Sequence, residues 1–461
     1  MEFQISLFQL LISFLLVLFM VITSVRKSKA KNLTQKLIPG PWKLPLIGNL
    51  HQLAASGLPH RTLCDLATKH GDFMHLQLGQ VSTVVVSSPE MAKEIMKTHD
   101  IVFANRPFLV VAKITTYECT DIVFSPYGTY WRNLRKICTA ELLSAARVAS
   151  FRSIREEEVL NLVETIKSNQ GLTVNLTEKI FSMSYAITAR AAFGKKCKDQ
   201  EAFISVVSQD SKKVEQKAKS EDEDQEDLVD LLLRLQEDGE FPLTDNNIKA
   251  ILFDVFTAGS ETSATAVEWA MSEMIKNPRV MTKAQAEVRK LFEGKGNVDE
   301  PGVHQLKYLK CVIKETLRLH PVIPLLIPRE SSRNCVVNGF EIPAKTRVIV
   351  NAWAIGRDPN YWVEPEKFEP ERFVNSSVDF MGTNFEFIPF GAGRRICPGI
   401  LFALANVELP LAQMLFHFDW KLPGEMKHED MDMTEKFGIS MKRENDLVLV
   451  PSPYHASISI A

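Results

Sequence analysis

The sequence lacks the signatures of several protein classes. Its seven cysteines show no C-x-x-C spacing, so neither a zinc ribbon nor a disulfide framework is indicated. Lys and Arg number 54 against 56 Asp and Glu, for a net charge of −2, and no basic excess argues for a nucleic-acid partner. No internal repeat is visible, and no G-x-G-x-x-G follows a predicted strand, so the chain has no dinucleotide-binding fingerprint of that type.

The chain has 461 residues, of which 45% are hydrophobic and 24% charged, as in a globular protein with a sizeable core. Residues 3–22 include sixteen apolar side chains and no charge, which is long enough for one membrane-spanning helix. Positive residues follow at once, which predicts a cytosolic body. A cleaved secretory signal is the alternative. The basic residues are Arg26, Lys27, Lys29, Lys31 and Lys36.

This pattern divides the chain into three parts. Residues 1–25 are expected to form the transmembrane anchor. Residues 26–50 are basic and proline-rich, and proline fixes φ and removes a hydrogen-bond donor, so they form a semi-rigid hinge. Residues 51–461 form the main domain.

Hydrophobic periodicity predicts a mainly α fold with small β-sheets. Helical patterns run over 153–167, 246–276 and 304–319. Residues 71–87 predict a β-hairpin around Gly79 and Gln80, and residues 334–350 predict a second hairpin with a turn at Asn338-Gly339.

The most specific motif is Phe390-Gly-Ala-Gly-Arg-Arg-Ile-Cys397-Pro-Gly399. Its glycines allow positive φ and close approach to another group. Backbone N–H groups and nearby arginines favour a thiolate at Cys397, and thiolates ligate soft metals or haem iron. The alternative for a lone cysteine is a buried side chain in a glycine-rich turn.

The pattern F-x-x-G-x-R-x-C-x-G resembles the haem-ligand loop of the cytochrome P450 monooxygenases, and further motifs of that family follow in order. The resemblance extends over almost the whole chain and implies haem b as cofactor, with Cys397 as the iron ligand. It also assigns contacts with the haem or its propionates to other residues. These are Trp131 and Arg135 in Trp-Arg-Asn-Leu-Arg, Arg329, Phe390, Gly391 and Arg395.

Two more motifs have implied roles. In Ala258-Gly-Ser-Glu-Thr262, the resemblance assigns Glu261 and Thr262 to proton delivery during oxygen activation. Gly259 is unfavourable within a helix, and a small residue is expected there because oxygen and substrate approach the backbone. Glu315 and Arg318 share a helix face, and with Arg372 of Pro-Glu-Arg-Phe they are implied to form a buried structural network.

The implied reaction inserts one atom of dioxygen into a C–H bond of an apolar substrate. Electrons would come from an NADPH-dependent flavoprotein reductase, and the enzyme would sit in the endoplasmic reticulum membrane by a single span. The resemblance is strongest to plant microsomal terpenoid hydroxylases, such as sesquiterpene and limonene oxygenases, which points to a mono- or sesquiterpenoid. An alkaloid or another apolar metabolite is the alternative. The expected pocket lining is Val110, Val111, Ile114, Val322, Leu325, Leu326, Ile327 and Ile439.

The chain departs from the family at about residues 198–227. Members of the family place two helices there as the roof of the pocket, whereas this stretch is short and highly charged. The roof helices are therefore expected to be shortened or missing. Two alternative functions follow: a truncated isoform that binds haem with little activity, and a haem-thiolate isomerase or dehydratase.

Overall fold

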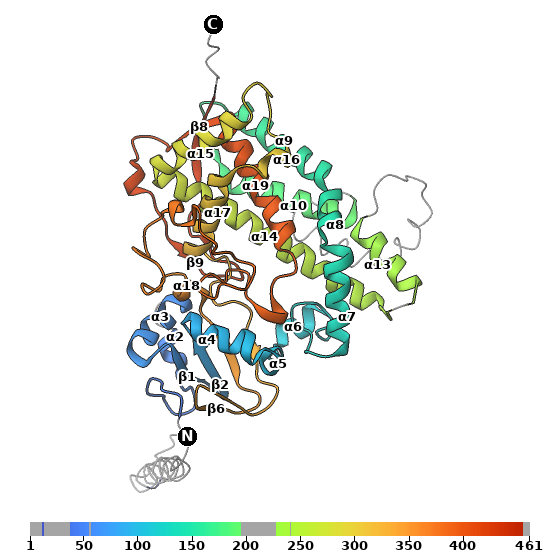
Figure 1. Ribbon diagram of the computed structural model, residues 1–461, viewed down its shortest axis with the longest axis vertical. Helices are drawn as coiled ribbons and strands as arrows, with labels where there is room; N and C mark the ends of the chain where they lie inside the picture. The colour runs from blue at the N-terminus through green and yellow to red at the C-terminus, as the bar shows by residue number, and fades with distance from the viewer. Residues whose placement is uncertain (1–11, 13–36, 55–56, 195–226, 240, 455–461) are drawn as a thin grey trace, which may run out of the picture.

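The structure is a computed structural model that describes residue 12 and residues 37–54, 57–194, 227–239 and 241–454 (Figure 1). The anchor predicted over 1–25, apart from Ile12, and the shortened segment at 198–227, apart from Asp227, lie outside the described residues. The described chain is mainly helical with small sheets, which confirms the predicted fold class.

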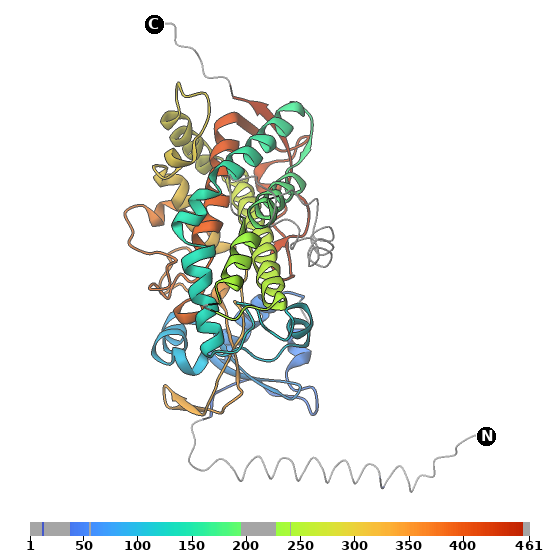
Figure 2. The same ribbon diagram turned by 90° about the vertical axis from the view of Figure 1, so that its right-hand side faces the viewer.

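Helices make up one end of the molecule, and the largest sheet lies at the other end (Figures 1 and 2). The longer helices are α3 (Pro59–His70), α7 (Thr129–Ile137), α9 (Arg152–Ser168), α10 (Leu176–Phe193), α13 (Leu228–Glu237), α14 (Asp245–Lys276), α15 (Pro278–Leu291), α17 (Lys307–Leu319) and α19 (Ile400–His417). The shorter helices are α2 (Leu50–Leu53), α4 (Pro89–Lys93), α5 (Asp100–Phe103), α6 (Val110–Thr115), α8 (Ala145–Ser150), α16 (Glu300–Val303) and α18 (Ala352–Ile355).

The largest sheet has four strands in the order β1-β2-β7-β4. Its strands are β1 (Phe73–Leu78), β2 (Val81–Val86), β4 (Arg329–Glu330) and β7 (Arg347–Val350). A second sheet joins β3 (Val174–Asn175), β11 (Val448–Pro453) and β8 (Phe418–Lys421). Two-stranded sheets pair β5 (Cys335–Val337) with β6 (Phe340–Ile342) and β9 (Glu435–Lys436) with β10 (Lys442–Arg443).

The first predicted hairpin is confirmed, because β1 and β2 pair antiparallel across Gly79-Gln80. The second is confirmed only as far as β6. Asn338 and Gly339 have φ of 48° and 78°, as its turn requires. The last part of the predicted hairpin was wrong, because β7 leaves it and pairs parallel with β2. In the four-stranded sheet the side chains of Val348 and Val350 are buried in the core, which favours this pairing over the predicted hairpin.

Helix α14 runs through the centre of the molecule and packs against α10 and α19. Thr244 and Asn247 form a reciprocal capping box at its start. Near the middle, the hydroxyl groups of Ser260 and Thr262 donate to the carbonyl oxygens four residues earlier, at 2.8 and 2.6 Å. Such bonds let polar side chains sit inside a helix without an unsatisfied hydroxyl.

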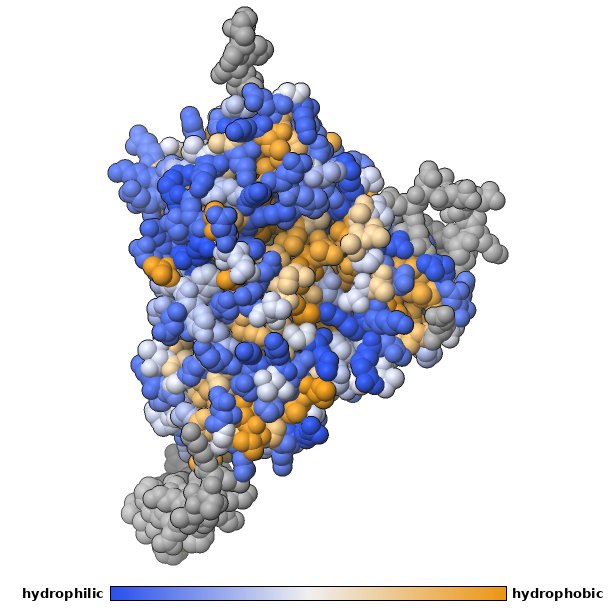
Figure 3. All heavy atoms as spheres, viewed as in Figure 1, coloured by the Kyte–Doolittle hydropathy of each residue, from blue (hydrophilic) through white to orange (hydrophobic). Residues whose placement is uncertain are grey.

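Helix α19 follows the cysteine motif and is strongly apolar. Among the described residues it is the one helix whose length and composition would suffice to cross a membrane, yet 67% of it is buried inside the protein. Burial of this kind marks a core helix. Part of α19 is exposed, since Leu401 is 45% exposed. Apolar side chains form a band across the middle of the face shown in Figure 3.

Candidate active site

The cysteine motif forms a tight loop that leads into α19. Gly391 and Gly393 have φ of 70° and 66°, a region that favours glycine. A Cβ on Gly393 would lie 2.1 Å from the carbonyl oxygen of Met96, so no other residue fits there. The Cys397 N–H donates to the Phe390 carbonyl at 3.0 Å and closes the loop. Positive φ and close contact with neighbouring backbone therefore explain why glycine occupies these positions.

The thiol of Cys397 has opposing influences on its pKa. Burial raises the pKa, and a hydrogen bond from the Gly399 backbone and the charge of Arg135 lower it. Burial prevails, contrary to the prediction that the loop alone would favour a thiolate. A soft metal bound to the sulfur would supply the missing stabilisation, because coordination deprotonates a thiol outright.

Trp131 and Arg395 meet beside this loop. The Trp131 indole donates to the Ile122 carbonyl at 2.9 Å. The Arg395 guanidinium lies 4.1 Å from the centre of the Trp131 ring and donates to the Ser125 carbonyl at 2.6 Å. The structure therefore brings these two predicted haem contacts together and binds both to residues 121–125.

Arg329 approaches the loop from β4. Its guanidinium pairs with Asp100 at 3.0 Å and donates to the Ala392 carbonyl at 2.6 Å. Arg106 lies nearby, 8% exposed, and donates to the carbonyls of Val123, Ile327 and Pro328 at 2.8–2.9 Å. Sequence reasoning did not select Arg106 as a site residue, because nothing in its spacing distinguishes it; only its burial does.

Four guanidinium groups are thus concentrated in one place. Burial and the charge of Arg329 lower the pKa of Arg395 to about 9, and Arg135 contributes in the same direction. Burial, with Arg395 and Arg329, lowers the pKa of Arg106 well below its usual value. Asp121 opposes these effects on the pKa of both Arg106 and Arg395, and Tyr127 also does so at Arg395. Haem carries two propionate carboxylates, and a cluster with surplus positive charge beside a cysteine fits such a group.

Glu261 and Thr262 lie in the middle of α14. Thr262 Oγ1 donates to the Ala258 carbonyl at 2.6 Å, and Ala258 is exposed among the described residues. Gly259 lies on a different side of the helix. A Cβ there would be 3.3 Å from both Phe402 of α19 and Thr188 of α10. The expectation that Gly259 makes room for oxygen and substrate was wrong; it permits close packing of three helices.

The β9–β10 hairpin holds the Glu261 carboxylate. Lys442 Nζ lies 3.0 Å from Glu261 Oε1, and the Ser440 hydroxyl donates to the same oxygen. Met441 is fixed between them, because its N–H donates to Val322 at 2.8 Å and its carbonyl accepts from Trp269 at 2.8 Å. Sequence reasoning missed Lys442, since 180 residues separate it from the motif it contacts.

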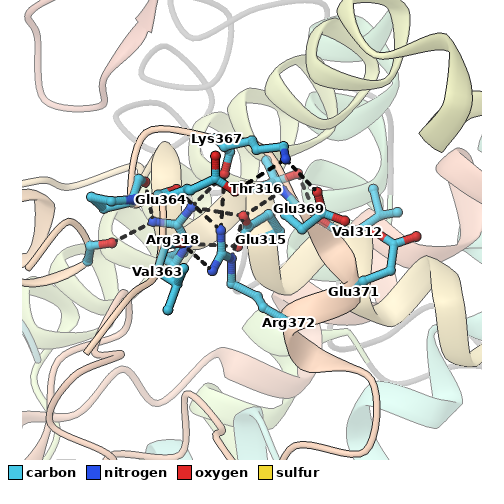
Figure 4. A network of polar contacts seen from close by, with 12 residues as sticks. Val312, Glu315, Thr316, Arg318, Val363, Glu364, Lys367, Glu369, Glu371 and Arg372 are labelled. Carbon is cyan, nitrogen blue, oxygen red and sulfur yellow. Dashed lines mark hydrogen bonds and ion pairs between the residues drawn. The ribbon is translucent and has the colours of Figure 1, made fainter. Parts of the chain in front are cut away.

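Glu315, Arg318 and Arg372 form one buried network (Figure 4). Both Glu315 oxygens accept from Arg318, at 2.7 and 2.8 Å, and Oε1 also accepts from Arg372 at 2.9 Å. The remaining guanidinium N–H groups reach backbone carbonyls, including Gly356 and Lys367. Glu315 is 0% and Arg318 1% exposed, so the network holds α17 to the residues that precede the cysteine loop.

Four of the eight predicted substrate-lining residues are open to solvent in the part of the chain described, whereas Val322 is buried and Leu325, Leu326 and Ile327 are half-buried. Val110, Val111 and Ile114 of α6 are 62%, 72% and 73% exposed, and Ile439 is 76% exposed. Large apolar side chains at such exposure mark a surface that another group covers.

Comparison with known proteins agrees with this geometry. The family described as Cytochrome P450 matches residues 38–210 and 200–450. The chain is a cytochrome P450. It is 53% identical to Cytochrome P450 71D10 of Glycine max, over 95% of this chain and 96% of that protein. It is 50% identical to premnaspirodiene oxygenase of Hyoscyamus muticus, with 94% and 96% covered, and 51% identical to tabersonine 16-hydroxylase 2 of Catharanthus roseus, with 96% and 97% covered.

The fold agrees as well. A zebra fish cytochrome P450 structure with abiraterone aligns with a TM-score of 0.76 at 25% identity, covering 87% of this chain and all of that chain. This cytochrome P450 is a haem-containing monooxygenase of the plant type that acts on specialised metabolites such as terpenoids and alkaloids.

Proposed function

We propose that this cytochrome P450 hydroxylates a neutral terpenoid, a mono- or sesquiterpene skeleton. Relatives at about 50% identity include both terpenoid and alkaloid oxygenases. The observation that favours a terpenoid is the pairing of the carboxylates in two segments expected to line the pocket, residues 106–120 and 253–262. Glu118 pairs with Lys113 at 3.2 Å, Asp254 accepts backbone N–H groups, and Glu261 pairs with Lys442. No carboxylate in these described segments is left for a protonated amine.

The residues of this chain would divide the work as follows. Cys397 would hold the haem iron, and Trp131, Arg135, Arg329 and Arg395 would hold the propionates. Bound haem supplies the activation of dioxygen and its insertion into a C–H bond. Phe390 and Gly391 would shape the loop on the cysteine side.

Proton delivery would use Thr262 and Glu261. Thr262 holds a proton in its bond to the carbonyl of Ala258, which is exposed among the described residues. Glu261 can pass protons from solvent, because its partner Lys442 has a side chain 36% exposed. A positioned acid of this kind contributes about 10²- to 10⁴-fold to a rate.

Electrons would come from an NADPH-dependent flavoprotein reductase at the endoplasmic reticulum membrane. The surface beside the cysteine loop is basic: Lys97, Arg132, Lys136 and Arg394 are exposed there. A cleft of about 520 Å³ opens next to Gly393 and Arg394. Basic patches of this kind steer acidic partners. The membrane assignment rests on residues 3–22 and the positive charge after them.

A second candidate is a truncated form that binds haem with little activity. The alignment with the Glycine max protein spans 488 positions but covers 95% of the 461 residues here, about 438, so about 50 positions have no counterpart in this chain. The family match is also interrupted, ending at residue 210 and restarting at 200. Loss of residues there would leave the apolar faces of α6 and the Ile439 turn uncovered.

Reconstitution with a plant reductase tests both candidates. The membrane-bound protein is given NADPH, ¹⁸O-labelled dioxygen and a panel of terpene hydrocarbons and tabersonine-type alkaloids. We expect a terpene product carrying one labelled oxygen. Turnover of alkaloids alone would refute the terpenoid proposal. NADPH use with peroxide release and no product from any substrate would favour the truncated form. Rearrangement of a peroxide without NADPH would favour the isomerase.

A further inference from the structure

The backbone of residues 120–125 is held almost entirely by side chains from other parts of the fold. The carbonyl of Ile122 accepts from Trp131 at 2.9 Å and that of Ser125 from Arg395 at 2.6 Å, and both donors are proposed haem contacts. The carbonyl of Val123 accepts from Arg106 at 2.9 Å. Cationic and indole donors therefore bind the carbonyls of this segment.

Two carboxyl groups bind its N–H groups. Asp254 Oδ2 of α14 accepts from the N–H groups of Ile122 and Val123, at 3.0 and 3.2 Å. Asp121 Oδ2 accepts from the Phe124 N–H at 2.9 Å. Asp121 is 0% and Asp254 7% exposed, so both carboxyl groups are out of water. The segment thus joins α14 to the arginines beside the cysteine loop.

The two carboxyl groups also lie close enough to influence each other: besides burial, the charge of Asp121 raises the pKa of Asp254. Asp121 Oδ1 is buried, and no N–H or hydroxyl of the described residues donates to it. Two carboxylates can bond directly only when one carries a proton, and two adjacent buried carboxyls cannot both ionise without a large cost. A proton held between the two acids would supply a donor to Asp121 Oδ1 and remove the repulsion.

We propose that Asp121 and Asp254 share one proton, and that this pair is a positioning device which fixes residues 121–125 and, through them, Trp131 and Arg395. The inference rests on the proposed haem contacts of those two residues. Loss of the shared proton would set two negative charges against each other, release the segment and loosen the grip on haem. Both acids would act through the segment, which makes them positioning residues.

Burial raises the pKa of Asp254 well above its usual value, and the neighbouring Asp121 adds to the effect. The pair therefore holds its proton to a higher pH than an ordinary aspartate does, and a rise in pH removes it. Other titratable groups face the pair. Burial raises the pKa of Tyr130 and of Cys138 to about 12, and burial also raises the pKa of Cys119. The cations are Arg106, with a strongly lowered pKa, and Arg395.

Arg395, with its pKa of about 9, is the competing explanation for any alkaline effect. Asparagine at position 254 separates the two. Asp254→Asn keeps an oxygen to accept from Ile122 and Val123, and it supplies a permanent N–H donor toward Asp121. Asp254→Leu removes both functions. Asp245→Asn, on the exposed first turn of the same helix, is the matched control.

The experiment measures haem transfer from the full-length holoprotein to excess apomyoglobin between pH 6 and 10, without substrate or reductase. We expect the wild type and the control to release haem about tenfold faster at pH 10 than at pH 7. A tenfold change corresponds to a difference of about one pKa unit between the haem-bound and haem-free states. Asp254→Asn should release it at the neutral wild-type rate throughout. Asp254→Leu should release it rapidly at every pH. An alkaline rise in Asp254→Asn equal to that of the wild type would overturn the proposal and assign the effect to Arg395.

Hydrogen exchange of the amides of Ile122, Val123 and Phe124 gives a readout that does not depend on haem. In apoprotein and holoprotein alike, protection should fall with rising pH relative to the intrinsic rate, and Asp254→Asn and Asp121→Asn should abolish that fall. Protection that follows the same pH course in these variants and the wild type would refute the shared proton. Loss of protection with haem release unchanged would refute the link to Trp131 and Arg395 while leaving the carboxyl pair in place.

Discussion

Lys442 Nζ lies 3.0 Å from Glu261 Oε1, although one residue belongs to β10 and the other to the middle of α14. The ammonium also lies 4.7 Å from the centre of the Phe181 ring, and the Ser440 hydroxyl donates to the same Glu261 oxygen. The carboxylate is therefore oriented by a neighbour that is far away in the sequence. This arrangement makes Lys442 a positioning residue for the proton delivery proposed for Glu261.

Lys442→Met should uncouple the reaction. Without the ammonium the Glu261 side chain is free to turn, and we expect about fivefold more peroxide per product, as for loss of an ion pair worth about 1 kcal/mol. Lys442→Arg keeps the charge and should restore most of the coupling. Peroxide and product are measured against NADPH consumed. Equal coupling in all three proteins would remove Lys442 from the proton path.

Cys397→Ala should abolish thiolate ligation. The carbon monoxide difference spectrum of the reduced protein should lose the strongly red-shifted band that an axial thiolate produces. Cys64→Ala, at a partly exposed cysteine of α3, is the control and should keep that band. Retention of the band in Cys397→Ala would place the iron ligand elsewhere.

Glu315→Ala should destabilise the protein by about 3–5 kcal/mol, because it leaves the buried guanidinium of Arg318 without its carboxylate. Glu164→Gln offers a contrast, since Glu164 pairs with Lys167 at 3.5 Å where the side chains are 68% and 60% exposed, and the expected cost is about 0–1 kcal/mol. Urea unfolding followed by the Soret band measures both variants. Similar losses would show that burial does not set the strength of the network.

Gly259→Val should destabilise the packing of α14 against α10 and α19 by about 1–3 kcal/mol, because the added atoms meet Phe402 and Thr188. Gly259→Ala should cost less, since its better helix propensity offsets part of the strain. Thermal unfolding compares the two. If stability were unchanged and only turnover fell, Gly259 would face the substrate after all.

The Glu435 carboxylate should make stability depend on acid pH. Burial alone would raise its pKa, but the hydrogen bond from His60 and the charge of Arg61 outweigh burial and lower the pKa to about 2. A carboxyl with a lowered pKa stabilises the fold above its ordinary value of 4.5, and that stabilisation disappears as pH falls from there toward 2. Glu435→Gln should flatten the dependence. Urea midpoints at pH 3.5, 5 and 7 test this, and an unchanged slope would contradict it.

Local patterns in the sequence predicted much of this structure. The cysteine motif, the helix over 246–276 and the Asn338-Gly339 turn all carry residue types whose backbone preferences act over short distances. What failed depended on distant contacts. Burial of Cys397 outweighs the loop's own influence on the thiol, and the neighbours of Gly259 come from two other helices. Arg106 and Lys442 were missed because only the fold brings them to their partners.

The two hydrogen bonds of Met441 divide the β9–β10 hairpin into separate parts. Before Met441 lie the exposed tip residues Phe437 and Ile439 and also Ser440; after it lies Lys442, so the anchored backbone stands between the tip and Lys442. Variation at Phe437 can therefore be absorbed without displacing Lys442, whereas Ser440 lies on the tip side of the anchor. For directed evolution of substrate scope, the exposed tip residues are suitable positions for a library. Ser440 and Lys442, which hold Glu261, should be left unchanged.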